Sequence, residues 1–244
     1  MPISTLICLF AIIVLAHTIE TVTGFGCTIV ALALGVYFVP VEVLVVTLVA
    51  IGWLQSAWLV ARGFRVIRWR LFFTRILPGA ALGFPVGIWA FGILDSEQLK
   101  LVLGGFVTII AALELVRLFR SGEVGKPLKP ALGFALLGAG GFFHGLFASG
   151  GPPIVYFTSR EIHDKGAFRA TLSWLWLLLN STLLVTYAVS GRLDREPLEL
   201  AAFLLPALVT GILAGEILHR RVNELAFKKA VQLLLLATGL MLLV

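Results

Sequence analysis

The stretch HGLFASGGPPIV, residues 144–155, decides how this chain folds. It lies inside an apolar run, 130–159, that contains no Asp, Glu, Lys or Arg. A spanning helix needs about 20 apolar residues, so the run is long enough to cross a membrane. The SGGPP segment at 149–153 interrupts it, because glycine loosens the backbone and proline removes a hydrogen-bond donor. Membranes tolerate such a break only where protein or a wet cavity satisfies the freed groups. The stretch therefore predicts a broken or re-entrant helical hairpin.

The composition outside this stretch is also that of a membrane protein. Of 244 residues, 59% are hydrophobic and only 13% are charged, whereas soluble domains carry about 25% charged residues. The mean hydropathy is +1.03. Further runs without a charged residue cover 21–41, 43–61, 76–94, 170–191 and 200–215, and a shorter run covers 230–244. The first apolar run has no basic region before it, so we expect it to be retained and not cleaved as a signal peptide. These features predict an all-α polytopic membrane protein in the lipid bilayer.

The chain is expected to contain two repeats, 1–121 and 130–244, joined by a polar loop at 122–129. Each half opens with an interrupted apolar run, TGFG at 23–26 and SGGPP at 149–153. Two residue patterns recur in the same order, which favours a duplication: Gly26, Ile29 and Val30 match Gly151, Ile154 and Val155, and Pro78, Gly83 and Gly87 match Pro206, Gly211 and Gly215.

Basic residues predict how the halves are oriented. After its hairpin, each half has three further segments, near 43–61, 71–94 and 98–118, then 168–190, 198–218 and 226–244. If the hairpins return, one side holds 16 of the 19 Lys and Arg residues. If they cross once, the split is 11 to 8. The positive-inside rule favours the first arrangement, with inverted repeats and both termini in the periplasm. Such transporters bind their substrate near the midplane, where the broken helices meet.

The residues at the interruptions resemble a known family. Residues 23–30, TGFGCTIV, and residues 144–155 look like the two signatures of the TauE/SafE, or sulfite exporter, family. The resemblance covers nearly the whole chain. It implies a bacterial cytoplasmic (inner) membrane carrier for sulfite, organosulfonates or related small anions, coupled to protons. Ala148-Ser149 departs from the second signature, where a glycine is common, and this leaves the identity of the ligand open.

The interruptions are the predicted site of the anionic substrate. A new helix N-terminus exposes N–H groups and carries about half a positive charge, so it can bind an anion without a buried Arg. The predicted substrate-binding residues are Thr23, Gly24, Phe25, Gly26, Thr28, His144, Ser149, Gly150, Gly151 and Pro152. The alternative is that these glycines only permit close helix crossing, which is the interpretation preferred for Gly79, Gly83 and Gly87.

Glu20 is the acidic residue deepest inside an apolar run, and His17 lies one turn before it on the same helical face. An embedded carboxyl is costly and indicates function, so Glu20 and His17 are the predicted proton-coupling residues. A structural role for either remains an alternative. Cys8 and Cys27 are expected to pack in the core, and no metal or cofactor is predicted.

Two other functions compete with a proton-coupled carrier. An anion channel can also use re-entrant hairpins. An intramembrane hydrolase is less favoured, because the sequence has no HExxH, GxSxG or paired-acid motif. No enzymatic activity is predicted. The charge of +6 lies in short loops and does not indicate nucleic acid, and a homodimer is a possible assembly.

Overall fold

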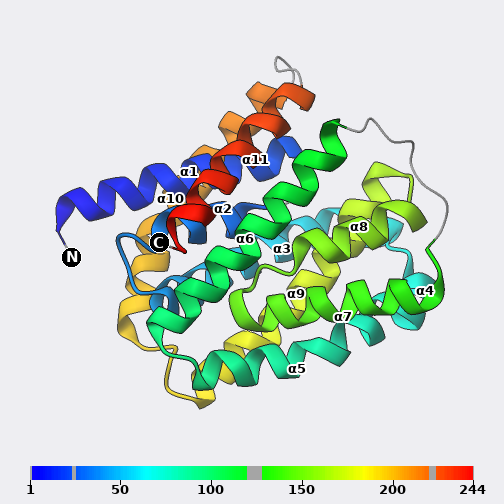
Figure 1. The fold of residues 1–244 in the computed structure, drawn as a ribbon, viewed down its shortest axis with the longest axis horizontal. Coiled ribbons are helices and arrows are strands. Elements are labelled where there is room, and N and C mark those ends of the chain that lie inside the picture. Colours follow the sequence, from blue (N-terminus) through cyan, green and yellow to red (C-terminus); the bar gives the residue numbers. More distant parts are fainter. Residues whose placement is uncertain (1, 24–25, 120–127, 220–223, 244) are drawn as a thin grey trace. The chain divides into compact units, whose positions relative to one another are not determined.

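The computed structural model describes residues 2–23, 26–119, 128–219 and 224–243. These residues form helices and short connections, and none of them lies in a β-strand (Figure 1). The elements are α1 (Ile3–Thr23), α2 (Cys27–Gly35), α3 (Val41–Gly63), the 3-10 helix η1 (Phe64–Val66), α4 (Trp69–Leu71), the π-helix η2 (Phe72–Ile76), α5 (Leu77–Ile93), α6 (Ser96–Phe119), α7 (Pro130–Phe147), α8 (Gly151–Glu161), α9 (Lys165–Val189), α10 (Arg195–His219) and α11 (Glu224–Met241).

Seven of these stretches are long and apolar enough to cross a membrane. They lie in α1, α3 with η1, the continuous α4–η2–α5 segment, α6, α7, α9 and α10, and a shorter apolar stretch, Val231–Met241, lies in α11. The prediction of an all-α polytopic membrane protein is thus confirmed. The six segments predicted to follow the two hairpins correspond to α3, α4–η2–α5, α6, α9, α10 and α11.

The chain forms two compact units, and each draws on both halves of the sequence. The first unit contains α1, α2, the start of α3, α6, α10 and α11. The second contains the rest of α3, η1, α4, η2, α5, α7, α8 and α9. The division into repeats at 122–129 concerns the origin of the sequence and stays a prediction, as does the inverted arrangement. Residues 122–127 of that loop lie outside the described residues.

In the second unit, α5 packs along α7 at a crossing made by glycines (Figure 1). A Cβ added to Gly83 would overlap the carbonyl oxygen of Gly138, and one added to Gly87 would overlap that of Phe142. A Cβ on Gly141 would overlap the carbonyl oxygen of Ala80 in the opposite direction. The backbones therefore touch, as in small-residue packing of membrane helices. The predicted packing role of the α5 glycines is confirmed.

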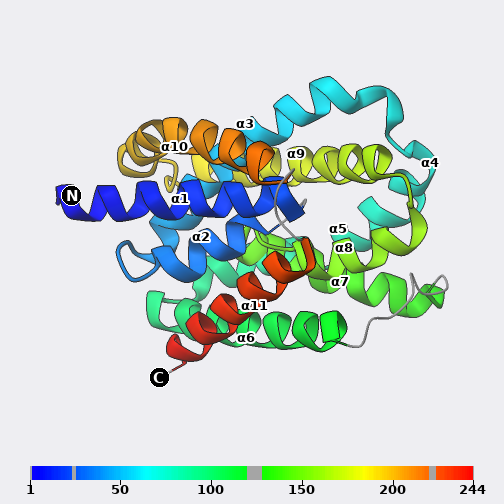
Figure 2. The same cartoon turned by 90° about the horizontal axis from the view of Figure 1, so that it is seen from above.

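In the first unit, α10 packs along α1 in a similar way (Figure 2). A Cβ on Gly211 would lie 2.7 Å from the carbonyl oxygen of Val14 and 2.9 Å from Cβ of His17. One on Gly215 would lie 2.5 Å from Cβ of Thr21. Glycines at matching sequence positions of the two halves thus allow a close crossing with the first helix of the other half.

Candidate functional site

The second interruption separates α7 from α8 by a sharp turn. Helix α7 ends at Phe147, and Ala148 adopts a left-handed conformation with φ 50°. The Ala148 N–H donates a hydrogen bond to the His144 carbonyl oxygen at 2.7 Å. Ala148 is the one non-glycine residue with positive φ in the described parts of the chain. Such a conformation costs an L-residue on the order of 1–2 kcal/mol, and strained backbone of this kind is often found at functional sites.

Helix α8 runs back along α7 after this turn. A Cβ on Gly133, near the start of α7, would lie 2.8 Å from the ring of Phe157, near the end of α8. Closer to the turn, a Cβ on Gly150 would overlap the Gly140 carbonyl oxygen and would lie 2.8 Å from Cβ of His144. The segment is therefore a tight helical hairpin, and glycines on both arms let its backbones approach.

The start of α8 offers fewer backbone donors than an ordinary helix end. Gly151 is its first residue, and the buried Pro152 and Pro153 follow. Proline has no N–H group, so Gly151 supplies the one backbone donor of the first three helical positions. Ser149, which is buried beside the turn, can add a hydroxyl donor. The predicted anion site at this interruption thus depends on Gly151, Ser149 and the helix dipole.

His144 lies in the last turn of α7 and is only 3% exposed. Its Nε2 lies 3.1 Å from Oδ1 of Asn180 on α9. Because that oxygen only accepts hydrogen bonds, Nε2 carries the proton and Nδ1 is the acceptor. Nδ1 is buried and has no hydrogen-bond partner among the described residues. The ring stacks on Trp176, with centroids 5.0 Å apart and planes at 12°. These contacts fix the orientation of the imidazole beside the turn.

Asn180 and Trp176 belong to this surrounding and were not among the predicted site residues. The contact of Asn180 with His144 links α7 and α9. The signal that could have found it is a single Asn inside the apolar run 170–191. Trp176 gives no comparable signal, because aromatic residues are common throughout such runs.

The first interruption separates α1 from α2. Gly24 and Phe25 lie outside the described residues, and nothing is described of the Thr23 side chain. Gly26, which precedes α2, has φ 102°, a conformation that favours glycine. Thr28 is half-buried in the first turn of α2, with Oγ1 3.7 Å from Sγ of Cys27.

Three titratable side chains come together at this interruption. A ring nitrogen of His17, a carboxylate oxygen of Glu20 and Sγ of Cys27 all lie within 4.8 Å of one another. His17 is buried, and the other two are half-buried. His17 and Glu20 share a face of α1, as predicted, whereas Cys27 joins them from α2. Cys27 is a free, half-buried cysteine, and its predicted role in core packing stays a prediction. These donor types can bind a transition metal ion, although no metal is predicted here.

The interruptions belong to different compact units. The second brings together His144, Ser149, Gly150, Gly151 and Pro152, and the first brings Glu20 and His17 close to the residues that begin α2. A single site formed by both interruptions stays a prediction.

Comparisons with known proteins identify the kind of chain. The family model described as sulfite exporter TauE/SafE matches residues 9–242. A curated relative, the probable inner membrane transporter protein TsaS of Comamonas testosteroni, is 29% identical over 179 residues. The match covers 72% of this chain and 73% of that protein. No solved structure matches.

Proposed function

Since this chain belongs to the sulfite exporter TauE/SafE family of membrane transporters, we propose that it carries sulfite, an organosulfonate or a similar small oxyanion across the bacterial inner membrane. The chain is a multi-pass transporter and not an enzyme, which excludes the hydrolase alternative. The proposal also includes proton coupling, a position for the anion in the protein and a homodimeric assembly.

The observation that carries the anion site is the tight α7–α8 turn with its buried polar residues. No Lys or Arg lies in the run 130–159, so neutral donors must hold the anion. Gly151 N–H and the Ser149 hydroxyl would donate, and the His144 imidazole in the last turn of α7 would line the site beside them. A helix end contributes about 0.3–1 kcal/mol when exposed and up to about 2 kcal/mol when partly buried. With a few hydrogen bonds this supports an affinity on the order of micromolar to millimolar, which suits a carrier that must release its cargo.

For proton coupling, we infer that Glu20, His17 and Cys27 form one titrating group in the first unit. Their donor atoms lie within 4.8 Å of one another, so the charge of one directly changes the proton affinity of the others. A carboxyl embedded in a membrane helix is costly and indicates function, which here would be to carry a proton. The proximity of three titratable groups supports a coupling role for this cluster.

The anion site is tested with Gly151→Val in proteoliposomes. Bulk at this position blocks approach to the N–H group, so flux of sulfite and methanesulfonate should be lost while the protein remains folded. Gly92→Val is the matched control, because nothing lies within 4 Å of a Cβ added there. Wild-type affinity of Gly151→Val for these anions would show that the α7–α8 turn is not part of the anion site.

Coupling is tested with Glu20→Gln under an imposed pH gradient. Glutamine keeps the shape and hydrogen bonding but carries no titrating proton, so proton-driven accumulation should disappear while anion exchange persists. Glu216→Gln on the exposed side of α10 is the control. Unchanged pH-dependent uptake would exclude Glu20 as the coupling group. The wild-type protein in the same experiment also distinguishes a carrier from a channel. A proton-coupled carrier accumulates the anion against the anion's own electrochemical gradient, whereas a channel does not.

A further inference from the structure

A basic cleft lies in the second unit, away from the interruption. It has a volume of about 820 Å³ and is lined by residues 67–71, Thr74 and Arg75 and by the end of α8. Segment 62–75 contains five arginines and no acidic residue, and three of them line the cleft: Arg68, Arg70 and Arg75. Basic residues that only set membrane orientation need no shared cavity, so their convergence calls for another explanation.

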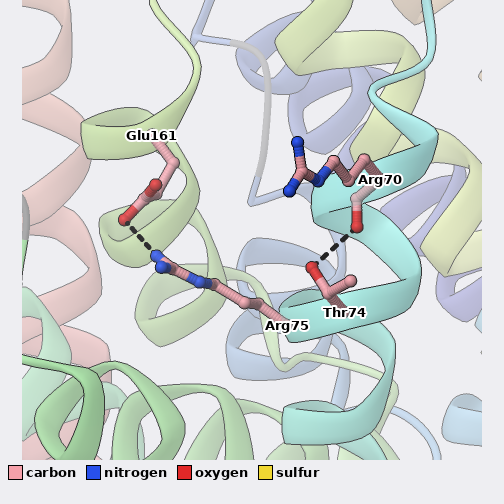
Figure 3. Close-up of polar contacts among 4 residues, drawn as sticks. All are labelled: Arg70, Thr74, Arg75 and Glu161. Carbon is pink, nitrogen blue, oxygen red and sulfur yellow. Dashed lines mark hydrogen bonds and ion pairs between the residues drawn. The ribbon is translucent and has the colours of Figure 1, made fainter.

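The local backbone brings these arginines together. Helix α4 continues directly into the π-helix η2, where the Leu77 N–H bonds to the Phe72 carbonyl oxygen. A π-turn closes over five residues, and such turns occur frequently at functional sites. Arg70 precedes this turn and Arg75 lies inside it. Figure 3 shows both side chains extending from this segment toward α8.

The charges in the cleft are not balanced. Nη1 of Arg75 pairs with Oε1 of Glu161 at 3.1 Å (Figure 3), and the Glu161 side chain is 16% exposed. The guanidinium groups of Arg68 and Arg70 are exposed and have no ion-pair partner in the described parts of the chain. Three positive charges thus face one carboxylate, which leaves an excess of two.

We propose that this cleft is a second oxyanion site, in which Arg68 and Arg70 bind a phosphate or sulfonate group. Guanidinium groups match the geometry of tetrahedral oxyanions through paired N–H donors. The volume lies within the usual range for ligand sites, so the cleft has room for a phosphate or sulfonate group that belongs to a larger molecule. Arg75 is paired with Glu161, so the ligand competes with that carboxylate for the Arg75 guanidinium group.

Two sources can supply that group, an anionic lipid headgroup or a soluble sulfonate. Trp69 lines the cleft and stacks on Phe73 with ring centroids 5.8 Å apart. The rings of Phe64 and Trp174 pack edge-on against Trp69. Aromatic residues of this kind gather at membrane interfaces.

The cleft is also separate from the proposed transport site. Helix α8 has 11 residues and spans about 16 Å, and the cleft lies at its end whereas the α7–α8 turn lies at its start.

The test measures binding to purified protein in two arms. One arm titrates methanesulfonate and inorganic phosphate in detergent. The other measures retention of phosphatidylglycerol against phosphatidylcholine in nanodiscs. The R68Q/R70Q variant should weaken binding about tenfold or more, because charge-assisted hydrogen bonds are lost. R62Q/R65Q removes the same charge from the same segment outside the cleft and should bind as wild type.

Glu161→Gln provides a change of opposite sign. It releases Arg75 to the ligand and should tighten binding severalfold, which keeps the proposal testable if R68Q/R70Q fails to fold. An effect in only one arm identifies the source of the oxyanion. Equal binding by wild type, R68Q/R70Q and Glu161→Gln, or equal losses in R68Q/R70Q and R62Q/R65Q, would overturn the proposal. Gly151→Val should retain this binding, so failure here is distinguishable from failure of the proposed transport site.

Discussion

Replacing Gly83 by alanine tests the closeness of the α5–α7 crossing. The added Cβ would overlap the Gly138 carbonyl oxygen and lie 2.8 Å from the Phe142 backbone nitrogen. Both atoms belong to the backbone of α7, so no side-chain rotation can relieve the overlap. Gly92→Ala on the same helix meets nothing within 4 Å. Gly83→Ala gains the helix propensity of an interior position, about 1 kcal/mol, whereas Gly92 lies in the last turn of α5 and gains less, so the difference between the variants gives a lower limit on the packing cost.

That cost is expected to be about 1–3 kcal/mol, the usual range for overpacking. For a chain of this size each kcal/mol shifts Tm by roughly 2–4 °C, so Gly83→Ala should melt about 2–12 °C below Gly92→Ala. The Tm of Gly211→Ala should lie between those of the other two variants, because its added Cβ would come within 2.7 Å of the Val14 carbonyl oxygen, a smaller overlap than at Gly83. The assay is thermal unfolding of purified variants in one detergent. Equal Tm values for Gly83→Ala and Gly92→Ala would refute the close backbone contact.

Two further predictions concern the site and the topology. Asn180→Leu leaves the buried His144 Nε2 proton without its acceptor and should lower the free energy of unfolding by about 1–3 kcal/mol. Thermal unfolding at neutral pH measures this loss, and an unchanged Tm would show that the hydrogen bond does not stabilise the fold. Single cysteines placed in loops 62–70, 121–129 and 160–168 should all react from the cytoplasm, because the basic residues favour that side. Labelling of the last two loops from opposite sides would contradict the inverted arrangement.

The spans follow from sequence because apolar length is the main requirement of a membrane helix. The predicted segments 43–61 and 168–190 lie close to α3 (Val41–Gly63) and α9 (Lys165–Val189). The predicted segment 71–94 matches Trp69–Ile93, but the π-turn inside it was not predicted. A π-turn changes hydrogen bonding without changing composition, so the residues of this segment carry no pattern that would reveal it.

The site was predicted less completely, because its contacts depend on how helices rotate against each other. Glu20 stood out as an acid in an apolar run, whereas Cys27 has only apolar neighbours and one Thr beside it in the sequence. Cys27 reaches Glu20 because the chain turns at Gly26, whose φ is 102°. His144 was predicted, but its partner Asn180 lies 36 residues away on another helix. No sequence spacing predicts that pairing.

The α1–α10 crossing constrains the order of events during biosynthesis. Thr18 Oγ1 lies 3.2 Å from the Gly211 carbonyl oxygen, and 193 positions separate the two residues. At about 5–20 residues per second, the ribosome needs roughly 10–40 s to make the partner of α1. Helix α5, by contrast, is already in the membrane when α7 emerges. A nascent chain stalled before α10 would leave the face of α1 that carries Thr18 without its packing partner.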